Sequence, residues 1–148
     1  MRVKKALHLL GIVLAMLPAC TPGGEAGVTV TDPWGRTSPT VAQNGAFYMT
    51  LTNEGITEDS LLFVSSDACS TVELHEMYDK GDGVMGMRPV ESGTIPIPAG
   101  GSAELKPGGL HAMCIGKQVE FAAGTEILLT LQFQEEGEME VTAVIRDN

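Results

Sequence analysis

The segment Ile127-Leu-Leu-Thr-Leu-Gln-Phe-Gln134, followed by Glu135-Glu-Gly-Glu138 and Met139-Glu-Val-Thr-Ala-Val-Ile145, decides the fold class of this chain. Toward the end of the first run apolar and polar residues alternate, and a period of two is typical of a half-buried β-strand. A short acidic turn that contains a glycine separates the two runs, which is typical of a β-hairpin. We therefore expect an antiparallel hairpin that closes the fold.

Short β-prone runs of the same kind recur upstream of this hairpin. Between residues 28 and 148 no stretch keeps apolar residues at helical spacing for three turns, and turns rich in glycine, proline, asparagine or aspartate separate the runs. Such a series of short strands favours an all-β domain, either a β-sandwich or a Greek-key barrel. The expected strands cover residues 28–31, 45–52, 59–65, 71–77, 86–90, 94–97, 102–105, 111–115, 126–133 and 138–145.

The first nineteen residues are typical of a signal peptide. A basic start precedes an apolar run over residues 6–17, and the small Ala19 comes directly before Cys20. The apolar run is too short to span a bilayer, which takes about 20 apolar residues. We expect residues 1–19 to be removed on export.

The tetrapeptide Leu17-Pro18-Ala19-Cys20 resembles the bacterial lipobox. The resemblance implies that Cys20 becomes the lipidated first residue of the mature chain and that its acyl chains hold the protein to a membrane. Residues 20–27 are expected to form this lipidated cysteine and a flexible tether. Thr21, in place of an aspartate, slightly favours attachment to the outer membrane in a cell with two membranes. Ordinary secretion with an unmodified Cys20 is the alternative, and we expect export to the periplasm or cell surface in either case.

The remaining residues, 28–148, have the length of a single domain. Removal of the signal peptide takes away Arg2, Lys4 and Lys5 and leaves six basic residues against nineteen acidic ones, a formal net charge of −13. This charge argues against a basic patch that would bind nucleic acid or an anionic membrane surface. We expect a monomer that meets the membrane through its lipid anchor.

Two cysteines, Cys69 and Cys114, remain after the anchor. An even pair in an oxidising compartment is a candidate disulfide. Its formation requires Cα atoms within about 7 Å of each other, which sequence spacing does not decide. Two buried free thiols are the alternative, so the sequence leaves the pairing open.

Both histidines that remain after the signal peptide lie in the same local pattern. They occur as His75-Glu76-Met77 and His111-Ala112-Met113, and a third methionine cluster, Met85-Gly86-Met87, lies between them. In a strand, residues i and i+2 project from the same face, so each His-x-Met would present an imidazole beside a thioether. Together the two pairs would supply two nitrogen and two sulfur donors.

Alternation indicates which face of the first pair is polar. Val72 and Leu74 lie on one face, so Glu73, His75 and Met77 share the other. An apolar core rarely takes that set. At the second pair the alternation leaves either face able to lie inside, and the repeat of the pattern carries the inference.

The donor set fits copper better than other metals. Thioether sulfur is a soft donor that favours Cu(I), and imidazole binds copper in either oxidation state. Zinc sites rarely use thioethers, and calcium or magnesium would need clustered oxygen ligands. A blue-copper electron-transfer site needs a cysteine ahead of its histidine and methionine, whereas Cys114 follows His111 and Met113. For each methionine taken alone, core packing is the alternative.

Several longer stretches carry a resemblance to a known family: Asp32-Pro-Trp-Gly-Arg36, Gly45-Ala-Phe-Tyr-Met-Thr-Leu-Thr-Asn53, Val72-Glu-Leu-His-Glu-Met77, Gly83-Val-Met-Gly-Met-Arg-Pro-Val90, Ile97-Pro-Ala-Gly-Gly101 and Glu104-Leu-Lys-Pro-Gly-Gly-Leu-His-Ala-Met113. Together they resemble the periplasmic copper chaperone family usually called PCuAC. The match covers nearly all of the mature domain. It implies a cupredoxin-like β-sandwich with a surface site for Cu(I).

The resemblance also implies a ligand set. By the family pattern the ligands would be His75, His111, Met113 and one methionine of the pair Met85 and Met87. The family spacing favours Met87, but the interval from His75 is one residue longer here, so Met85 stays open. Met77 would be an auxiliary donor.

The implied function is that of a copper chaperone and not of an enzyme. The protein would bind one Cu(I) and pass it by ligand exchange toward cytochrome c oxidase, to an oxidase subunit or to another copper chaperone, and binding of Cu(II) stays open. The sequence contains no Gly-x-Ser-x-Gly elbow, and no histidine is left for general-base work if both bind metal. A metal-free β-sandwich that mediates interactions at the cell surface is the alternative.

Overall fold

The computed structural model describes residues 27–147, and this part of the chain is all-β. Within it there is no helix that is long and apolar enough to cross a membrane. The prediction of an all-β domain is confirmed, and every strand expected from the sequence is found. The strands are β1 (Val28–Arg36), β2 (Asn44–Asn53), β3 (Asp59–Ser65), β4 (Cys69–Asp79), β5 (Met85–Pro89), β6 (Ile95–Ile97), β7 (Ser102–Leu105), β8 (His111–Lys117), β9 (Glu126–Phe133) and β10 (Glu138–Arg146).

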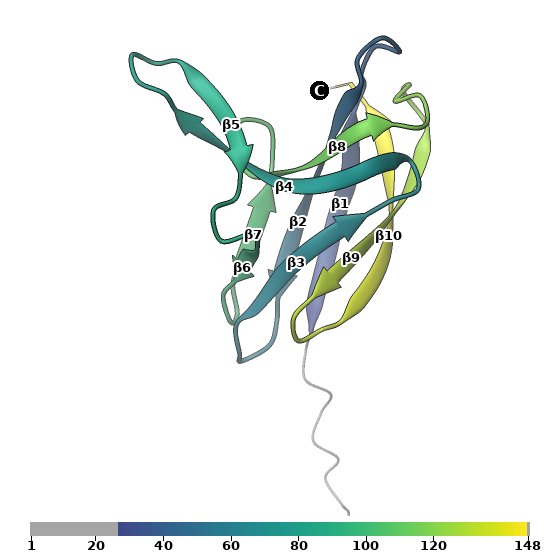
Figure 1. Ribbon diagram of the computed structural model, residues 1–148. Coiled ribbons are helices and arrows are strands. Elements are labelled where there is room, and N and C mark those ends of the chain that lie inside the picture. The colour runs from purple at the N-terminus through teal and green to yellow at the C-terminus, as the bar shows by residue number, and fades with distance from the viewer. Residues whose placement is uncertain (1–26, 148) are drawn as a thin grey trace, which may run out of the picture.

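The described strands belong to one continuous sheet that folds back on itself around the core (Figure 1). The hydrogen-bonded order is β5-β4-β8-β2-β1-β10-β9-β3-β6, and β7 pairs with β2. Neighbouring strands run antiparallel except β1 and β10, which run parallel. Because β3 lies against β4 and β6 lies against β7, the two ends of the sheet approach each other. The result is a β-sandwich.

The alternation that predicts the closing hairpin also sets its packing. Leu129, Leu131 and Phe133 on β9 are buried, and so is Ile127, whereas Leu128 between them is exposed. The alternation therefore runs along the whole strand and not only its end. Large buried side chains from other parts of the sheet complete the core; they include Phe47, Met49, Leu51, Leu61, Ile95, Ile97, Phe121 and Ile145.

Strand β1 is longer than the sequence predicted, because an irregularity lets it continue past a proline. The expected strand ended at Thr31, but pairing with β2 resumes at Trp34 after a shift in register. Asp32 adopts a φ of 48° at this point. The bulge takes Pro33, which has no backbone N–H, out of the ladder. Trp34 then packs against Tyr48 of β2, with ring centroids 4.6 Å apart.

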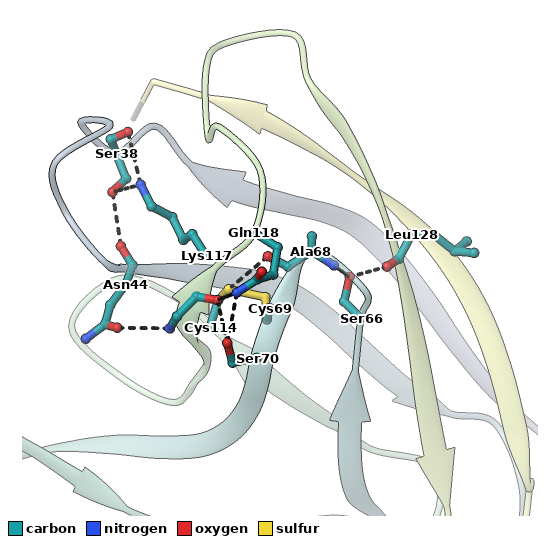
Figure 2. The surroundings of a disulfide bond; sticks show 11 residues. Ser38, Asn44, Ser66, Ala68, Cys69, Ser70, Cys114, Lys117, Gln118 and Leu128 are labelled. Carbon is teal, nitrogen blue, oxygen red and sulfur yellow. Dashed lines mark hydrogen bonds between the residues drawn. A yellow bond between two sulfur atoms is a disulfide. The ribbon is translucent and has the colours of Figure 1, made fainter.

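Cys69 on β4 and Cys114 on β8 are joined in a disulfide, with Cα atoms 5.5 Å apart (Figure 2). The sequence left this pairing open. The cysteines are 45 residues apart, so in the chain-entropy account the cross-link stabilises the fold by about 4 kcal/mol by restricting the unfolded chain. Beside it, the Gln118 side-chain amide donates a hydrogen bond of 2.9 Å to the Ser70 hydroxyl. The disulfide therefore holds β4 against β8.

A carboxylate ties the start of β3 to the turn between β9 and β10. Asp59 accepts hydrogen bonds from the backbone N–H of Ser60 at 2.6 Å and from those of Glu135 and Glu136 at 3.0 Å each. Burial alone would raise the pKa of Asp59, but the backbone donors outweigh burial and hold the pKa below its usual value. The ionised carboxylate therefore stabilises the fold.

The substitution Asp59→Asn should lower the free energy of unfolding by about 2 kcal/mol near neutral pH, because its amide NH₂ would face a backbone donor. Since the pKa in the folded state lies below the reference value of 3.8, the native stabilisation is fully present above that pH and is lost as the pH falls through the folded-state pKa. Urea unfolding at a series of pH values measures both effects. Equal acid sensitivity of the native protein and the variant would contradict this account.

Replacing Cys69 and Cys114 together by serine should lower the free energy of unfolding by about 2 to 5 kcal/mol, because the unfolded chain regains its freedom. Thermal and urea unfolding of the native protein and the double variant measure the difference. The native protein under reducing conditions is the matched control and should lose a similar amount. A loss below about 1 kcal/mol would mean that packing alone holds the two strands together.

Candidate metal centre

The two histidines of the repeated pattern are direct cross-strand partners. His75 on β4 pairs with His111 on β8, and paired residues of an antiparallel ladder point to the same face. Their ring centroids are 5.7 Å apart. On the opposite face Leu74 and Ala112 are buried in the core. The sequence did not decide which face of β8 lies inside. In the structure the His111 side chain lies on the outer face of the sheet, as does the His75 side chain of β4.

Although both imidazoles lie on the outer face, both are buried. The exposed fraction is 8 % for His75 and 5 % for His111. Tyr48 of β2 contributes to this cover, since its ring centroid is 6.4 Å from that of His111. Burial lowers the pKa of His111, the nearby His75 lowers it further, and a hydrogen bond to the Gly109 carbonyl opposes the shift. A neutral imidazole, which is the form that binds metals, is therefore favoured at His111.

The hydrogen bond of His111 defines which of its nitrogens is free. Nδ1–H donates to the Gly109 carbonyl oxygen at 3.1 Å, so the lone pair is on Nε2. Gly109 belongs to a tight turn in which its own N–H donates to the Lys106 carbonyl at 3.0 Å. Gly108 in this turn has a φ of 80°, a conformation that glycine adopts without strain. The turn before His111 thus orients its ring.

His75 uses the other ring nitrogen. Its Nε2–H donates to the Glu73 carboxylate at 2.9 Å. Its Nδ1 is buried and has no hydrogen-bond partner among the described residues. A buried polar atom without a partner costs on the order of 1 to 3 kcal/mol. A ligand that binds the Nδ1 lone pair would remove this cost.

Methionines from β5 and β8 line a hollow beside His111. Met87 and Met113 line the same hollow as His111, a cavity of about 240 Å³ that also includes Tyr48 and Ala46. Met113 is the cross-strand partner of both Ala46 on β2 and Glu73 on β4. The hollow therefore brings one imidazole and two thioethers together, with His75 in the adjacent position on β4.

The other two candidate methionines lie further along the hairpin of β4 and β5. Met77 pairs with Met87 across this hairpin, on the same face. Met85 pairs with Asp79, two residues further from the histidines, and unlike Met87 it does not line the hollow. The geometry thus distinguishes Met87 from Met85, which the spacing in sequence did not.

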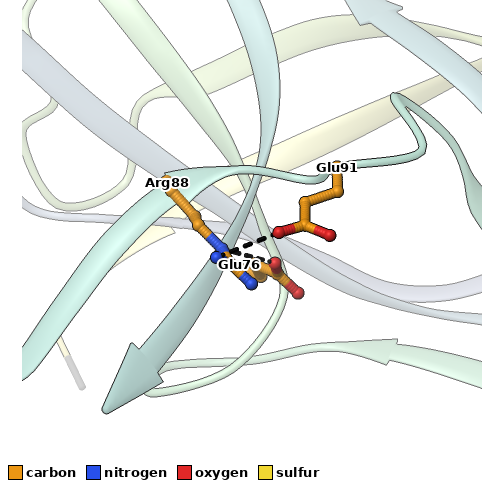
Figure 3. A network of polar contacts seen from close by, with 3 residues as sticks. All are labelled: Glu76, Arg88 and Glu91. Atoms are coloured by element: carbon orange, nitrogen blue, oxygen red, sulfur yellow. Dashed lines mark hydrogen bonds and ion pairs between the residues drawn. The ribbon is translucent and has the colours of Figure 1, made fainter. Parts of the chain in front are cut away.

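The hairpin of β4 and β5 projects from the body of the sandwich (Figure 1). We call it the arm, residues 76–88. On one side of the arm the Arg88 guanidinium donates to Glu76 at 2.9 Å and pairs with Glu91 at 3.1 Å (Figure 3). It also lies 4.8 Å from the centroid of the Tyr78 ring. Exposed ion pairs contribute roughly 0 to 1 kcal/mol each. Of these two ion pairs, only that of Arg88 and Glu76 links β5 to β4, and it adds little to the backbone ladder that sets Met87 opposite Met77.

Sequence analysis did not assign roles to several residues of this site. Glu73 could be assigned to the face of His75 by alternation, but its hydrogen bond to the ring could not. Tyr48 and the Gly109 carbonyl carry no local signal, because their contacts depend on how β2, β8 and the preceding turn are arranged in space. The predicted signal peptide, residues 1–19, and the predicted lipidation site Cys20 lie outside the described residues.

Within residues 27–147, no three side chains of histidine, cysteine, aspartate and glutamate form a group that could hold a metal ion. The candidate centre instead combines imidazole with thioether. Imidazole and thioether are ligands that suit copper, and thioether in particular selects Cu(I). The fold and this centre together define a β-sandwich domain that presents soft donors on the outer face of its sheet.

Comparison with known proteins places the chain in a family. The model of the family described as "Putative lipoprotein LpqE-like" matches residues 28–145, and the chain belongs to this family. A relative from Leifsonia xyli subsp. xyli (strain CTCB07), named "Putative lipoprotein Lxx21020", is 32% identical over 157 residues, which cover 99% of this chain and 91% of that protein.

Solved structures with the same fold include PCuAC domains and DR1885. The apo PCuAC domain from PmoF1 matches with a TM-score of 0.69 and 22% identity over 84% of this chain and 97% of that chain. The copper-bound PCuAC domain from PmoF2 has a TM-score of 0.67 and 19% identity, with 84% and 96% covered. CuI-DR1885 from Deinococcus radiodurans has a TM-score of 0.63 and 23% identity, with 88% and 84% covered. These matches confirm the cupredoxin-like β-sandwich that the resemblance implied.

Proposed function

We propose that this protein is an extracytoplasmic copper carrier that binds one Cu(I) ion and passes it on by ligand exchange. The observation that carries the proposal is the cross-strand pair of His75 and His111, beside a hollow that His111 shares with Met87 and Met113. Two imidazoles and two thioethers form a neutral, soft donor set, which favours Cu(I). The copper-bound PCuAC domain and CuI-DR1885 share the fold, which supports copper as the cargo.

The proposed ligands are His75, His111, Met113 and Met87. Met87 is preferred to Met85 because it lines the hollow with His111 and Met113. Met77, the cross-strand partner of Met87, is an auxiliary donor at the entrance to the arm.

Release of the ion would proceed by replacement of one donor at a time. Met87 is half exposed on the arm, so a donor of a recipient protein can approach the ion from that side. A thioether carries no proton to gain or lose, so Met87 can dissociate from the ion without a change of protonation. Because the same ion can be held by both proteins during the exchange, it need not enter solvent. The resemblance to PCuAC proteins favours cytochrome c oxidase as the destination, through one of its subunits or another copper chaperone.

The proposal includes an exported, membrane-anchored location, which the first part of the sequence and the family name support. Residues 1–19 have the pattern of a signal peptide, and the lipobox resemblance makes Cys20 the lipidated residue. The family and the Leifsonia relative both carry the name of a lipoprotein, which supports this proposal. Residues 20–27 would tether the domain within reach of recipients at the membrane.

Anaerobic titration of Cu(I) in competition with a chelator tests the site. The native protein should bind one equivalent, and the double variant His75→Ala/His111→Ala should bind about a hundredfold more weakly or worse, a loss of at least about 2.7 kcal/mol. Circular dichroism and urea unfolding should show that the variant remains folded. Absence of saturable binding by the native protein would remove the copper proposal.

A matched pair of methionine variants tests the ligand set. Met87→Leu should weaken Cu(I) binding by about tenfold, or about 1.4 kcal/mol, because it removes one donor. Met85→Leu is the control, since it makes the same change two residues earlier on the same strand and should leave the affinity unchanged. Leucine and methionine have similar volumes, so the folding stability of both variants should stay close to that of the native protein. A larger effect at Met85 than at Met87 would reverse the assignment.

A further inference from the structure

The two histidines of the candidate centre make hydrogen bonds through opposite ring nitrogens. His111 donates from Nδ1 to a backbone carbonyl at 3.1 Å, whereas His75 donates from Nε2 to the Glu73 carboxylate at 2.9 Å. A neutral imidazole carries one proton, so each hydrogen bond leaves the lone pair on the other nitrogen. The two rings therefore leave different nitrogens free.

We propose that Glu73 is a positioning residue for the metal: it keeps the proton of His75 on Nε2, so that His75 binds the ion through Nδ1 while His111 binds through Nε2. This inference rests on the proposed function, because it concerns the same site. Glu73 does not touch the ion in this account. It acts through the His75 ring, as carboxylates do for many metal-binding histidines.

The surroundings of His75 give Glu73 this role. Nδ1 is buried and lacks a hydrogen-bond partner within residues 27–147, so no described protein group holds a proton there. The Glu73 carboxylate accepts hydrogen bonds and cannot donate one when ionised, so it favours a proton on Nε2. Without Glu73, neither nitrogen of the His75 ring would have an acceptor among the described residues, so the proton would no longer be fixed on Nε2.

Glu73 is also held in a fixed place relative to the other donors. On β4 it lies two residues before His75 and therefore on the same face. Across the ladder its partner is Met113, a proposed ligand on β8. The register that pairs His75 with His111 thus also places the carboxylate beside the centre. The pairing of β4 with β8 therefore positions the two imidazoles, the Met113 thioether and the carboxylate that orients the His75 ring.

The exposure of the Glu73 side chain indicates how much Cu(I) affinity its removal should cost. Loss of an outer group that orients a metal-binding histidine typically weakens metal binding by about 10- to 100-fold. The Glu73 side chain is 44% exposed, so water can partly replace it as acceptor of the Nε2 proton. We expect a loss near the lower end, about tenfold, when the acceptor is removed.

The test compares Glu73→Leu, Glu73→Gln and the control Glu76→Gln in the purified protein. Glu73→Leu removes the acceptor, and Glu73→Gln keeps an acceptor oxygen while it removes the charge. Glu76→Gln removes the same charge on the same strand, but Glu76 pairs with Arg88 on the side of the arm away from His75. Two readouts are used: the ¹⁵N chemical shifts of the His75 ring without metal at about pH 8, and the Cu(I) affinity by anaerobic competition.

The expected results differ among the three variants. The native ring should show a protonated Nε2 and an unprotonated Nδ1, and Glu73→Leu should give a mixture of tautomers together with about a tenfold loss of Cu(I) affinity. Glu73→Gln should retain the native tautomer and lose less affinity than Glu73→Leu, and Glu76→Gln should match the native protein in both readouts. A native ring protonated on Nδ1 would overturn the proposal. So would a Glu73→Leu variant with unchanged tautomer, whether or not its affinity falls.

The tautomer is measured without copper, so its outcome does not depend on the proposed function. If the native protein binds no Cu(I) but Glu73→Leu changes the tautomer, the copper carrier fails while the orienting contact stands. If Cu(I) binds and the tautomer does not respond to Glu73→Leu, the carrier stands and the role of Glu73 is refuted.

Discussion

The register of β4 against β8 is the constraint on which the rest of the structure depends. It sets His75 opposite His111 and Glu73 opposite Met113. Because side chains alternate along a strand, a slip of one residue would turn one imidazole toward the core and bring an apolar residue to the outer face. The disulfide between Cys69 and Cys114 cross-links the same two strands. It therefore stabilises the strand pairing that both the fold and the candidate centre require.

The inner face of β4 and β8 packs against the core, and the outer face carries the two imidazoles. On the inner face Leu74 and Ala112 belong to the core, which stabilises the sheet by burial of apolar surface. On the outer face the imidazoles are buried by their neighbours and not by the core, so they are shielded from water and still lie near the surface. In the proposed function an ion would enter and leave on this side, where the hollow next to His111 and the arm lie.

Local patterns in the sequence were sufficient for the fold class and for most strands. Alternation in the segment that ends at Phe133 predicted a half-buried strand, and in the structure it extends over the whole of β9, with Leu128 exposed. The same pattern ended the predicted first strand at Thr31, before Pro33, because a proline normally ends a strand. The bulge at Asp32 that carries β1 onward to Trp34 depends on pairing with β2 and β10, partners that are distant in sequence.

The sequence by itself determined that this is an all-β chain with two His-x-Met pairs whose members share a face, since a period of two is a local property of a strand. It also determined the chemical character of the donors. Tertiary structure alone decided that His75 and His111 are cross-strand partners, that Met87 and not Met85 lines the hollow with His111 and Met113, and that Glu73 accepts a hydrogen bond from the His75 ring. Those facts follow from register and from strand packing between segments tens of residues apart, which no local pattern encodes.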